Sequence, residues 1–373
     1  MKAVYLSEFV IGKPDGPGVN EHEFSSSLLN IDPEVSVDII AIQNSQAKKK
    51  NRMDYAFRQL SLISALLVLA LKKRNKVDVV IARSGPLPVA TLLASILLNC
   101  PVYIKTAGDG RFAVLSGKSG LVYRALYWLC RKLWGALLKR TLAVDVVSRS
   151  HASGFSSNLV YNPTNIHIID NGVNTDFFQK SGNLMLSQEF LDWKARFKVL
   201  VGYIGGYPLV RGGGHLLELY KELESRDAGI VIIGGEKEEV SRHAMNLGCS
   251  DAWITGQIPY KDVPAYMAAL DIGVSILEPS AWGASEQKLR QYLSSELVAV
   301  CTPASNDELI KAGVVVPALS DSRADVLSAI DEALQKVNDE EFRFRARKYA
   351  VDRLSVNSRT ARRLEIIRKS LKK

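Results

Sequence analysis

Short runs of β-branched and other apolar residues recur along the 373-residue chain, with helical patterns between them. Nearly continuous apolar runs of this kind are typical of strands buried on both faces, as in parallel sheets between helix layers. The alternation therefore predicts an α/β protein with two doubly wound, Rossmann-like domains. The expected strands lie at 2–6, 37–42, 77–82, 101–106, 144–148 and 167–170, and then at 198–205, 229–235, 252–255, 272–277, 297–301 and 314–319.

The strand pattern stops in FFQKSGNLMLSQEFLDWK (177–194), where polar residues cluster. We therefore place a first domain at 1–179 and a second at 180–341, followed by basic helices at 342–373. Ligands of doubly wound folds bind beyond the carboxyl ends of the strands, so the cleft between the two domains is the expected site.

Composition excludes several kinds of site. The four cysteines form no C-x-x-C and the five histidines form no H-x-x-x-H pair, so we expect reduced core thiols and no metal. Glu8 lies where a signal peptide needs apolar residues, which favours a cytoplasmic protein. The apolar run 60–71 is shorter than the ~20 residues of a membrane span, and we interpret it as a buried helix.

Charge is divided unevenly along the chain, whose net charge is +9. Residues 1–179 hold 21 Lys and Arg against 13 Asp and Glu (+8), residues 180–341 hold 15 against 24 (−9), and residues 342–373 hold 12 against 2 (+10). A uniformly basic nucleic-acid-binding protein would not divide in this way, and no motif for DNA or RNA appears. Nucleic acid is therefore not an expected partner.

Two strand-to-helix turns of the second domain combine glycine or small residues with a cation. The strand 198–205 leads into Gly205 and Gly206, and Arg211 then precedes three glycines, where it could clamp a phosphate in bidentate fashion. In GASEQKLRQYLSSELVAVC (283–301), Ser285 suits a helix N-cap and Lys288 adds a charge to the first turn. Each turn alone also fits a solvated surface cation, but the two together predict a diphosphate site.

Five segments carry a family resemblance: PDGPGVNEHEFSSSLL (14–29), IIDNGVNTDFF (168–178), YIGGYPLVRGG (203–213), TGQIPYKDVPAYMAALDIGVSIL (255–277) and SEQKLRQYLSSELVAV (285–300). Over nearly its whole length the chain resembles the family-4 glycosyltransferases, which are retaining nucleotide-sugar enzymes of GT-B fold. The resemblance implies a hexosyltransferase-type enzyme that moves a sugar from a nucleotide-diphosphate sugar to a glycan acceptor. It also implies no metal or other cofactor, and a place in envelope, capsule or exopolysaccharide synthesis.

The resemblance assigns roles residue by residue. Arg211, Ser285 and Lys288 match contacts to the donor diphosphate, and Gln291 matches a contact to the ribose. The backbone near Gln257 and Ile258 matches the wall beside the nucleobase, and Gly16 and Gly18 match a loop that closes over the donor. The implied donor-binding set is Gly16, Gly18, Gly205, Gly206, Arg211, Gln257, Ile258, Ser285, Lys288 and Gln291. The implied catalytic set is Asp109, Arg211 and Lys288.

Some positions depart from the family pattern. Gly206 stands where a phosphate-binding arginine is usual, and Gly283 and Gln291 stand where the family has two glutamates. Glu286 replaces the usual proline. Gly108 replaces a common active-site histidine, which makes Asp109 the candidate polar group there. These departures leave two alternatives open: a catalytically degenerate partner subunit, and a nucleotide-sugar epimerase of similar fold.

The segment LVYRALYWLCRKLWGALLKR (121–140) predicts an amphipathic helix with one basic sector. The sector contains Arg124, Trp128, Arg131, Lys132 and Lys139. Leu126, Leu129, Leu133 and Leu137 are expected opposite it, and Tyr123, Tyr127 and Trp134 at its flanks.

Basic residues with interleaved aromatics suit an anionic lipid surface, although a buried helix with a solvated outer face is the alternative. If the last helix, within 358–373, crosses back to the first domain, the two basic regions gather. The sequence thus predicts peripheral attachment to the inner leaflet and a polyprenyl-linked acceptor.

Overall fold

The computed structural model describes most of the chain, and the chain divides into two compact units. The described residues are 1–11, 16–43, 52–73, 75–83, 88–106, 120–147, 151–153, 155, 165–179, 186–206, 208–210, 212–277, 287–303 and 306–372. The N-terminal unit comprises Met1–Gly172 with Val356–Lys373, and the C-terminal unit comprises Val173–Ser355.

These divisions differ from the bounds expected at 179/180 and 341/342. Val173 and Phe178 are buried in the core of the C-terminal unit, so the chain enters that unit before its polar stretch begins. Ala346 and Ala350 are buried in the same core, so the chain leaves it only after Ser355.

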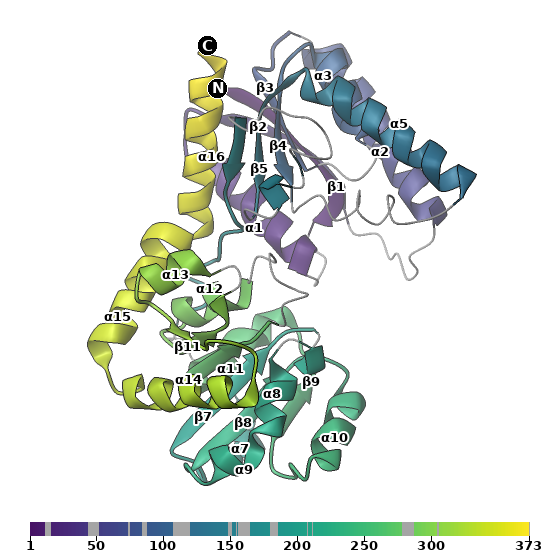
Figure 1. Ribbon diagram of the computed structural model, residues 1–373. Coiled ribbons are helices and arrows are strands. Elements are labelled where there is room, and N and C mark those ends of the chain that lie inside the picture. The colour runs from purple at the N-terminus through teal and green to yellow at the C-terminus, as the bar shows by residue number, and fades with distance from the viewer. Residues whose placement is uncertain are drawn as a thin grey trace. The chain divides into compact units, whose positions relative to one another are not determined.

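The N-terminal unit contains a six-stranded, wholly parallel sheet of order β2-β1-β3-β4-β5-β6 (Figure 1). All six of its expected strands form. Their bounds are β1 Lys2–Ile11, β2 Ser36–Gln43, β3 Val79–Arg83, β4 Val102–Thr106, β5 Thr141–Val146 and β6 Ile166–Ile168.

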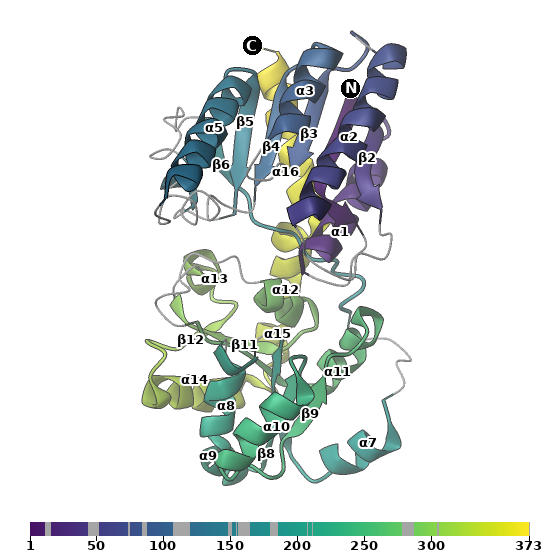
Figure 2. The same ribbon diagram turned by 90° about the vertical axis from the view of Figure 1, so that its right-hand side faces the viewer.

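Helices cover both faces of this sheet, which is why its strands are apolar throughout (Figure 2). One face packs under α2 (Arg52–Lys73), α3 (Val89–Leu98) and α5 (Leu121–Leu138), through side chains such as Leu66 and Trp134. The other face packs under α1 (Gly16–Asn30) and α16 (Val356–Leu371), through Phe24, Leu28 and Leu364.

Buried ion pairs fasten α16 to the N-terminal sheet. The Arg363 guanidinium donates to Asp145 on β5, and its Nη2 lies 3.2 Å and 3.1 Å from the carbonyl oxygens of Ile169 and Asp170. One turn earlier, Arg359 Nε lies 2.7 Å from Asp170 Oδ1. These contacts hold the last helix of the chain against the N-terminal sheet.

The C-terminal unit contains a second parallel sheet of six strands, in the order β12-β11-β10-β7-β8-β9. Its six expected strands also form, as β7 Val199–Ile204, β8 Ala228–Ile233, β9 Trp253–Gly256, β10 Ile272–Ser275, β11 Val298–Cys301 and β12 Val316–Pro317. Its helices are α7 Gln188–Lys194, α8 Gly213–Glu218, α9 Tyr220–Glu224, α10 Lys237–Asn246, α11 Val263–Ala269, α12 Gln287–Ser294, α13 Asp307–Lys311, α14 Arg323–Lys336 and α15 Glu340–Tyr349.

The interpretation of 60–71 as a buried helix is wrong in part. Leu62 and Leu66 are buried, but Leu60, Leu67 and Leu71 on the other side of α2 are exposed, because α2 is an outer helix of a single layer. None of the helices in the described ranges has the length and apolar character needed to cross a bilayer. All four cysteines are buried free thiols, as expected.

The return of α16 gives a stability prediction. Arg363→Ala should lower the free energy of unfolding by about 3 kcal/mol or more, because it leaves Asp145 buried without its cation. Arg362→Ala, at the adjacent exposed position of the same helix, should change it by less than about 0.5 kcal/mol. Urea unfolding monitored by circular dichroism measures both. Equal losses in the two variants would contradict this role of Arg363.

Candidate functional site

The first part of the candidate site is the turn at the carboxyl end of β7. Gly205 has φ +149° and its N–H donates to the carbonyl of Ile233 at 2.9 Å, which joins the ends of β7 and β8. A Cβ on Gly234 would lie 2.4 Å from the Gly205 oxygen, so both positions require glycine. Packing and backbone conformation therefore require glycine at these two positions, and the adjoining Gly206 is exposed.

Lys288 on α12 is directed at the end of β7. Its Nζ lies 3.2 Å from the hydroxyl of Tyr203 and 4.4 Å from the centroid of that ring, so the ammonium makes both a hydrogen bond and a cation–π contact. A Cβ on Gly205 would lie 2.7 Å from the same hydroxyl. Tyr203 thus connects the predicted cation with the predicted glycine turn, a role that the sequence analysis did not assign.

Tyr292 fixes α12 against the sheet. Its hydroxyl accepts from the Ile204 N–H at 3.0 Å and donates to the Val274 carbonyl at 3.2 Å, so it joins β7 and β10. A Cβ on Gly273 would lie 2.4 Å from the Tyr292 ring, so glycine there allows the helix to pack closely. Since Lys288 lies one turn before Tyr292 on α12, this contact sets the position of its ammonium.

The space at Gly206 differs from that at its neighbour. A Cβ built on Gly206 would meet no heavy atom within 4 Å, and its φ is not in the left-handed region. Packing therefore does not require glycine at the position where the family usually has an arginine.

Three other predicted donor residues lie in the C-terminal unit, after β9 and on α12. Gln257 follows β9 and its side-chain amide donates to Glu236 Oε1 at 2.6 Å, while Ile258 packs against the core. Gln291 lies on α12 and is buried.

The structure does not describe four of the residues that the sequence singled out. Asp109, Arg211, Gly283 and Ser285 lie outside the described residues. Gly16 and Gly18 belong to the first turn of α1, so the helix begins where the resemblance placed a loop.

The glycines after Arg211 have a packing role. A Cβ on Gly213 would lie 2.8 Å from Pro208 Cβ, and one on Gly214 would lie 2.6 Å from the Leu209 oxygen. The packing of this turn therefore accounts for the glycines at 213 and 214 without a ligand.

The predicted basic sector of α5 lies on the surface. Arg124, Trp128, Arg131, Lys132 and the adjoining Lys139 are all exposed. The placement of Trp134 beside this sector is wrong, because Trp134 is buried against Phe155 in the core (ring centroids 5.6 Å apart). Leu126 and Leu129, expected on the buried side, are exposed as well.

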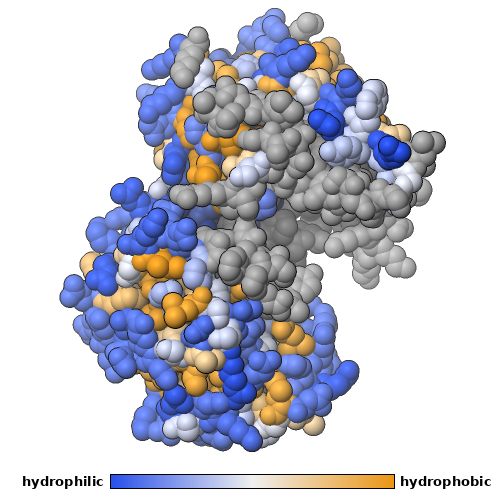
Figure 3. All heavy atoms as spheres, viewed as in Figure 1, coloured by the Kyte–Doolittle hydropathy of each residue, from blue (hydrophilic) through white to orange (hydrophobic). Residues whose placement is uncertain are grey.

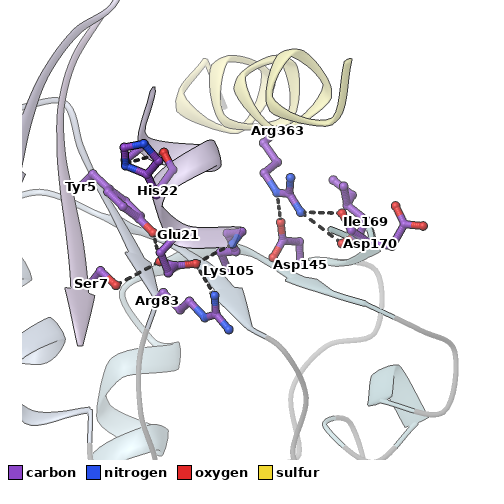
Figure 4. Close-up of polar contacts among 11 residues, drawn as sticks. Tyr5, Ser7, Glu21, His22, Arg83, Lys105, Asp145, Ile169, Asp170 and Arg363 are labelled. Carbon is purple, nitrogen blue, oxygen red and sulfur yellow. Dashed lines mark hydrogen bonds and ion pairs between the residues drawn. The ribbon is translucent and has the colours of Figure 1, made fainter. Parts of the chain in front are cut away.

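A second group of charges lies beside the middle of β1 and the carboxyl ends of β3 and β4, and the sequence analysis missed it (Figure 4). Glu21 of α1 is completely buried and accepts from four side chains: Tyr5, Ser7 at 3.0 Å, Arg83, and Lys105 at 2.9 Å. Because Glu21 lies near the start of α1, this network fixes the helix start, with Gly16 and Gly18, to β1 and to the ends of β3 and β4.

Opposite charges keep this network ionised. Burial acts to raise the pKa of Glu21, but Lys105 and Arg83 outweigh it and bring the pKa to about 2. Burial lowers the pKa of Lys105 to about 8, with Glu21 opposing the shift. At neutral pH the carboxylate and both cations are therefore charged.

The strand register explains how these residues meet. Ser7 pairs with Arg83 across β1 and β3, and Lys105 pairs with Asp145 across β4 and β5, so the four lie near one end of the sheet. The sequence did hold one sign of this charged group, which is a cation at or next to the end of an apolar strand, as in VVIAR and VYIKT.

Comparison with solved structures assigns the fold. A glycosyltransferase from Rickettsia africae ESF-5 matches with a TM-score of 0.69 at 17% identity, covering 100% of this chain and 99% of that one. Anabaena Alr3699/HepE, solved in complex with UDP, matches with a TM-score of 0.70 at 14% identity, covering 99% of this chain and 100% of that one.

The chain has the GT-B fold. The fold also occurs outside the transferases: a putative UDP-N-acetylglucosamine 2-epimerase from Listeria monocytogenes matches with a TM-score of 0.60 at 13% identity, covering 100% of this chain and 96% of that one. The sequence matches no family model and no curated protein.

The Glu21 network gives a prediction with a pH window. Glu21→Gln should lower the free energy of unfolding at neutral pH by about 3 kcal/mol or more, because two buried cations lose their carboxylate. Since folding lowers the pKa of Glu21 from 4.5 to about 2, its contribution is complete above pH 4.5 and is lost as the pH falls to 2.

Urea unfolding across this window measures the difference between the wild type and Glu21→Gln. The exposed Glu238→Gln serves as control and should change stability by less than about 0.5 kcal/mol at any pH. A Glu21→Gln penalty that stays constant from neutral pH to pH 2 would contradict the assigned ionisation.

Proposed function

We propose that this protein is a retaining, hexosyltransferase-type glycosyltransferase that uses a nucleotide-diphosphate sugar as its donor. The observation that carries the proposal is the contact of Lys288 with Tyr203 beside the Gly205 turn. A cation and approachable backbone at the carboxyl end of a central strand suit a diphosphate. The binding of UDP by HepE, a protein of the same fold, supports this reading.

In this proposal the protein acts mainly by positioning and by charge. Lys288 and Arg211 stabilise the negative charge that develops on the leaving diphosphate, without a metal or other cofactor. The acceptor hydroxyl attacks the anomeric carbon on the face that the diphosphate leaves, and the diphosphate oxygen takes the hydroxyl proton. The product keeps the anomeric configuration, and Asp109 is the proposed polar group beside the reacting sugar.

Donor binding also involves other predicted residues. Ser285, Gln291, Gly16, Gly18 and the backbone at Gln257 and Ile258 are proposed to complete the donor site.

For the acceptor, we propose a polyprenyl-linked or other glycan of envelope, capsule or exopolysaccharide synthesis. The protein would work in the cytoplasm, attached peripherally to the inner leaflet of the membrane. The exposure of Arg124, Trp128, Arg131, Lys132 and Lys139 supports this attachment, because an anionic surface attracts cations and accommodates tryptophan at its interface.

An epimerase is the second candidate, since the Listeria protein has the same fold. It would convert a free nucleotide sugar without any acceptor. A catalytically degenerate partner subunit, suggested by Gly206, Gly283 and Gln291, would bind nucleotide and turn over neither donor nor acceptor.

Lys288→Ala tests the proposal most simply. Sugar transfer should fall about a hundredfold or more, because one of the cations that stabilise the leaving diphosphate is lost. Arg211→Ala should have an effect of the same order. The exposed Lys221→Ala is the matched control and should transfer at the wild-type rate. Release of nucleotide from labelled donor measures all three, and a wild-type rate in Lys288→Ala would exclude the assignment.

Gly206→Arg tests the departure from the family pattern. The open space at Gly206 accommodates a side chain, and an arginine there should strengthen UDP binding by about tenfold through a charge-assisted hydrogen bond to phosphate. Calorimetric titration with UDP measures the change, with Gly206→Gln as the uncharged control. If Gly206→Arg weakens UDP binding in a folded protein, the phosphate does not lie at this turn.

A further inference from the structure

The outer face of α2 lacks charge over three helical turns. From Leu60 to Leu71 its exposed side chains are apolar, small or serine, and Leu71 is 89% exposed. At 1.5 Å per residue this stripe is about 16 Å long. Surface helices normally present charged and polar residues to water, so an apolar stripe of this length indicates a surface that is covered in the working protein. Its large members are Leu60, Leu67, Val68 and Leu71.

The neighbouring helix α3 extends this surface. Its sequence, VATLLASILL, has no charged residue, and its outward side includes the exposed Ile96, with Leu93 and Leu97 half-buried beside it. The helix packs between α2 and α5 in one layer over the sheet (Figure 2). We call this outer surface of α2, α3 and α5 the outer layer face.

The third helix adds positive charge and aromatic side chains. No acidic residue occurs in α5, whereas Arg124, Arg131 and Lys132 are exposed and Trp128 is 61% exposed. Lys132 Nζ lies 5.6 Å from the Trp128 ring centroid. Strongly hydrophilic side chains stand out among paler ones at the position of α5 (Figure 3), whereas hydrophilic side chains cover most of the visible C-terminal unit. The outer layer face is thus apolar on α2 and α3 and basic on α5.

We infer that the outer layer face docks on an anionic lipid bilayer, with the α2 stripe entering the interface and α5 contacting the head groups. A second copy of the chain is the poorer occupant, because α3, α5 and the α2 stripe contain no acidic residue that could pair with the α5 cations of another copy. Anionic lipid instead provides both a charge complement and an apolar layer. The inference deepens the proposed function, on which it rests, by assigning the apolar contact to α2 rather than to α5.

The test is co-sedimentation with vesicles of phosphatidylglycerol and phosphatidylcholine. Leu67→Gln/Leu71→Gln should partition about tenfold or more weakly than the wild type, and the loss should persist at high salt because it removes apolar contact. Arg131→Gln/Lys132→Gln should weaken binding at low salt and only slightly at high salt. The matched control is Met245→Gln/Leu319→Gln, which replaces two exposed apolar residues of the C-terminal unit and should bind like the wild type.

Two further measurements separate the outcomes. Thermal melting without vesicles confirms that the exposed substitutions leave the fold intact, and nucleotide titration on the same variants tests the donor site independently. Vesicle binding that ignores Leu67 and Leu71 would overturn the inference while nucleotide binding stands. Vesicle binding without any nucleotide binding would overturn the proposed function alone. If vesicle-free wild type is dimeric and Leu67→Gln/Leu71→Gln is monomeric, the face is an interface between copies and the lipid assignment is wrong.

Discussion

Parallel pairing of the strands is the constraint on which the rest of the structure depends. Each parallel connection has to cross back over the sheet through a helix, so all strands of a unit end at the same edge. In the N-terminal unit this edge gathers Arg83 and Lys105 around Glu21 of the first helix. In the C-terminal unit it gathers the Gly205 turn and Lys288. Two chemically different arrangements thus follow from the same backbone rule.

The strands could be predicted because burial on both faces leaves an apolar run that a single sequence displays. The place of Lys288 in the first turn of a helix could be predicted because it is a local property of the sequence. The partners of buried charges could not: Arg83 and Lys105 end their runs visibly, but their meeting with Glu21 depends on how α1 packs. The exposure of α2 was missed because its apolar run gives no sign that only one side of the helix meets a sheet.

The fold does not decide the reaction, since transferases and an epimerase share it. The side chains at the sheet edge bear on the ligand instead, since they suit a diphosphate that a transferase and an epimerase would both bind. The Lys288 ammonium contacts both the ring and the hydroxyl of Tyr203, and Tyr292 fixes the helix that carries Lys288. The ammonium is therefore positioned before a ligand arrives. This C-terminal region has an excess of acidic residues, which makes a held cation beside an open glycine turn the more informative feature.

The central claim is that the turn at Gly205 binds the diphosphate of a nucleotide sugar. A thermal-shift panel of UDP, GDP, ADP and their sugars tests it most directly, because a ligand that binds only the folded state raises the melting temperature further as its concentration increases above its dissociation constant. The account predicts that at least one nucleotide diphosphate raises the melting temperature of the wild type, and that the corresponding nucleoside does not. A panel in which no nucleotide changes the melting temperature, at concentrations up to millimolar, would contradict it.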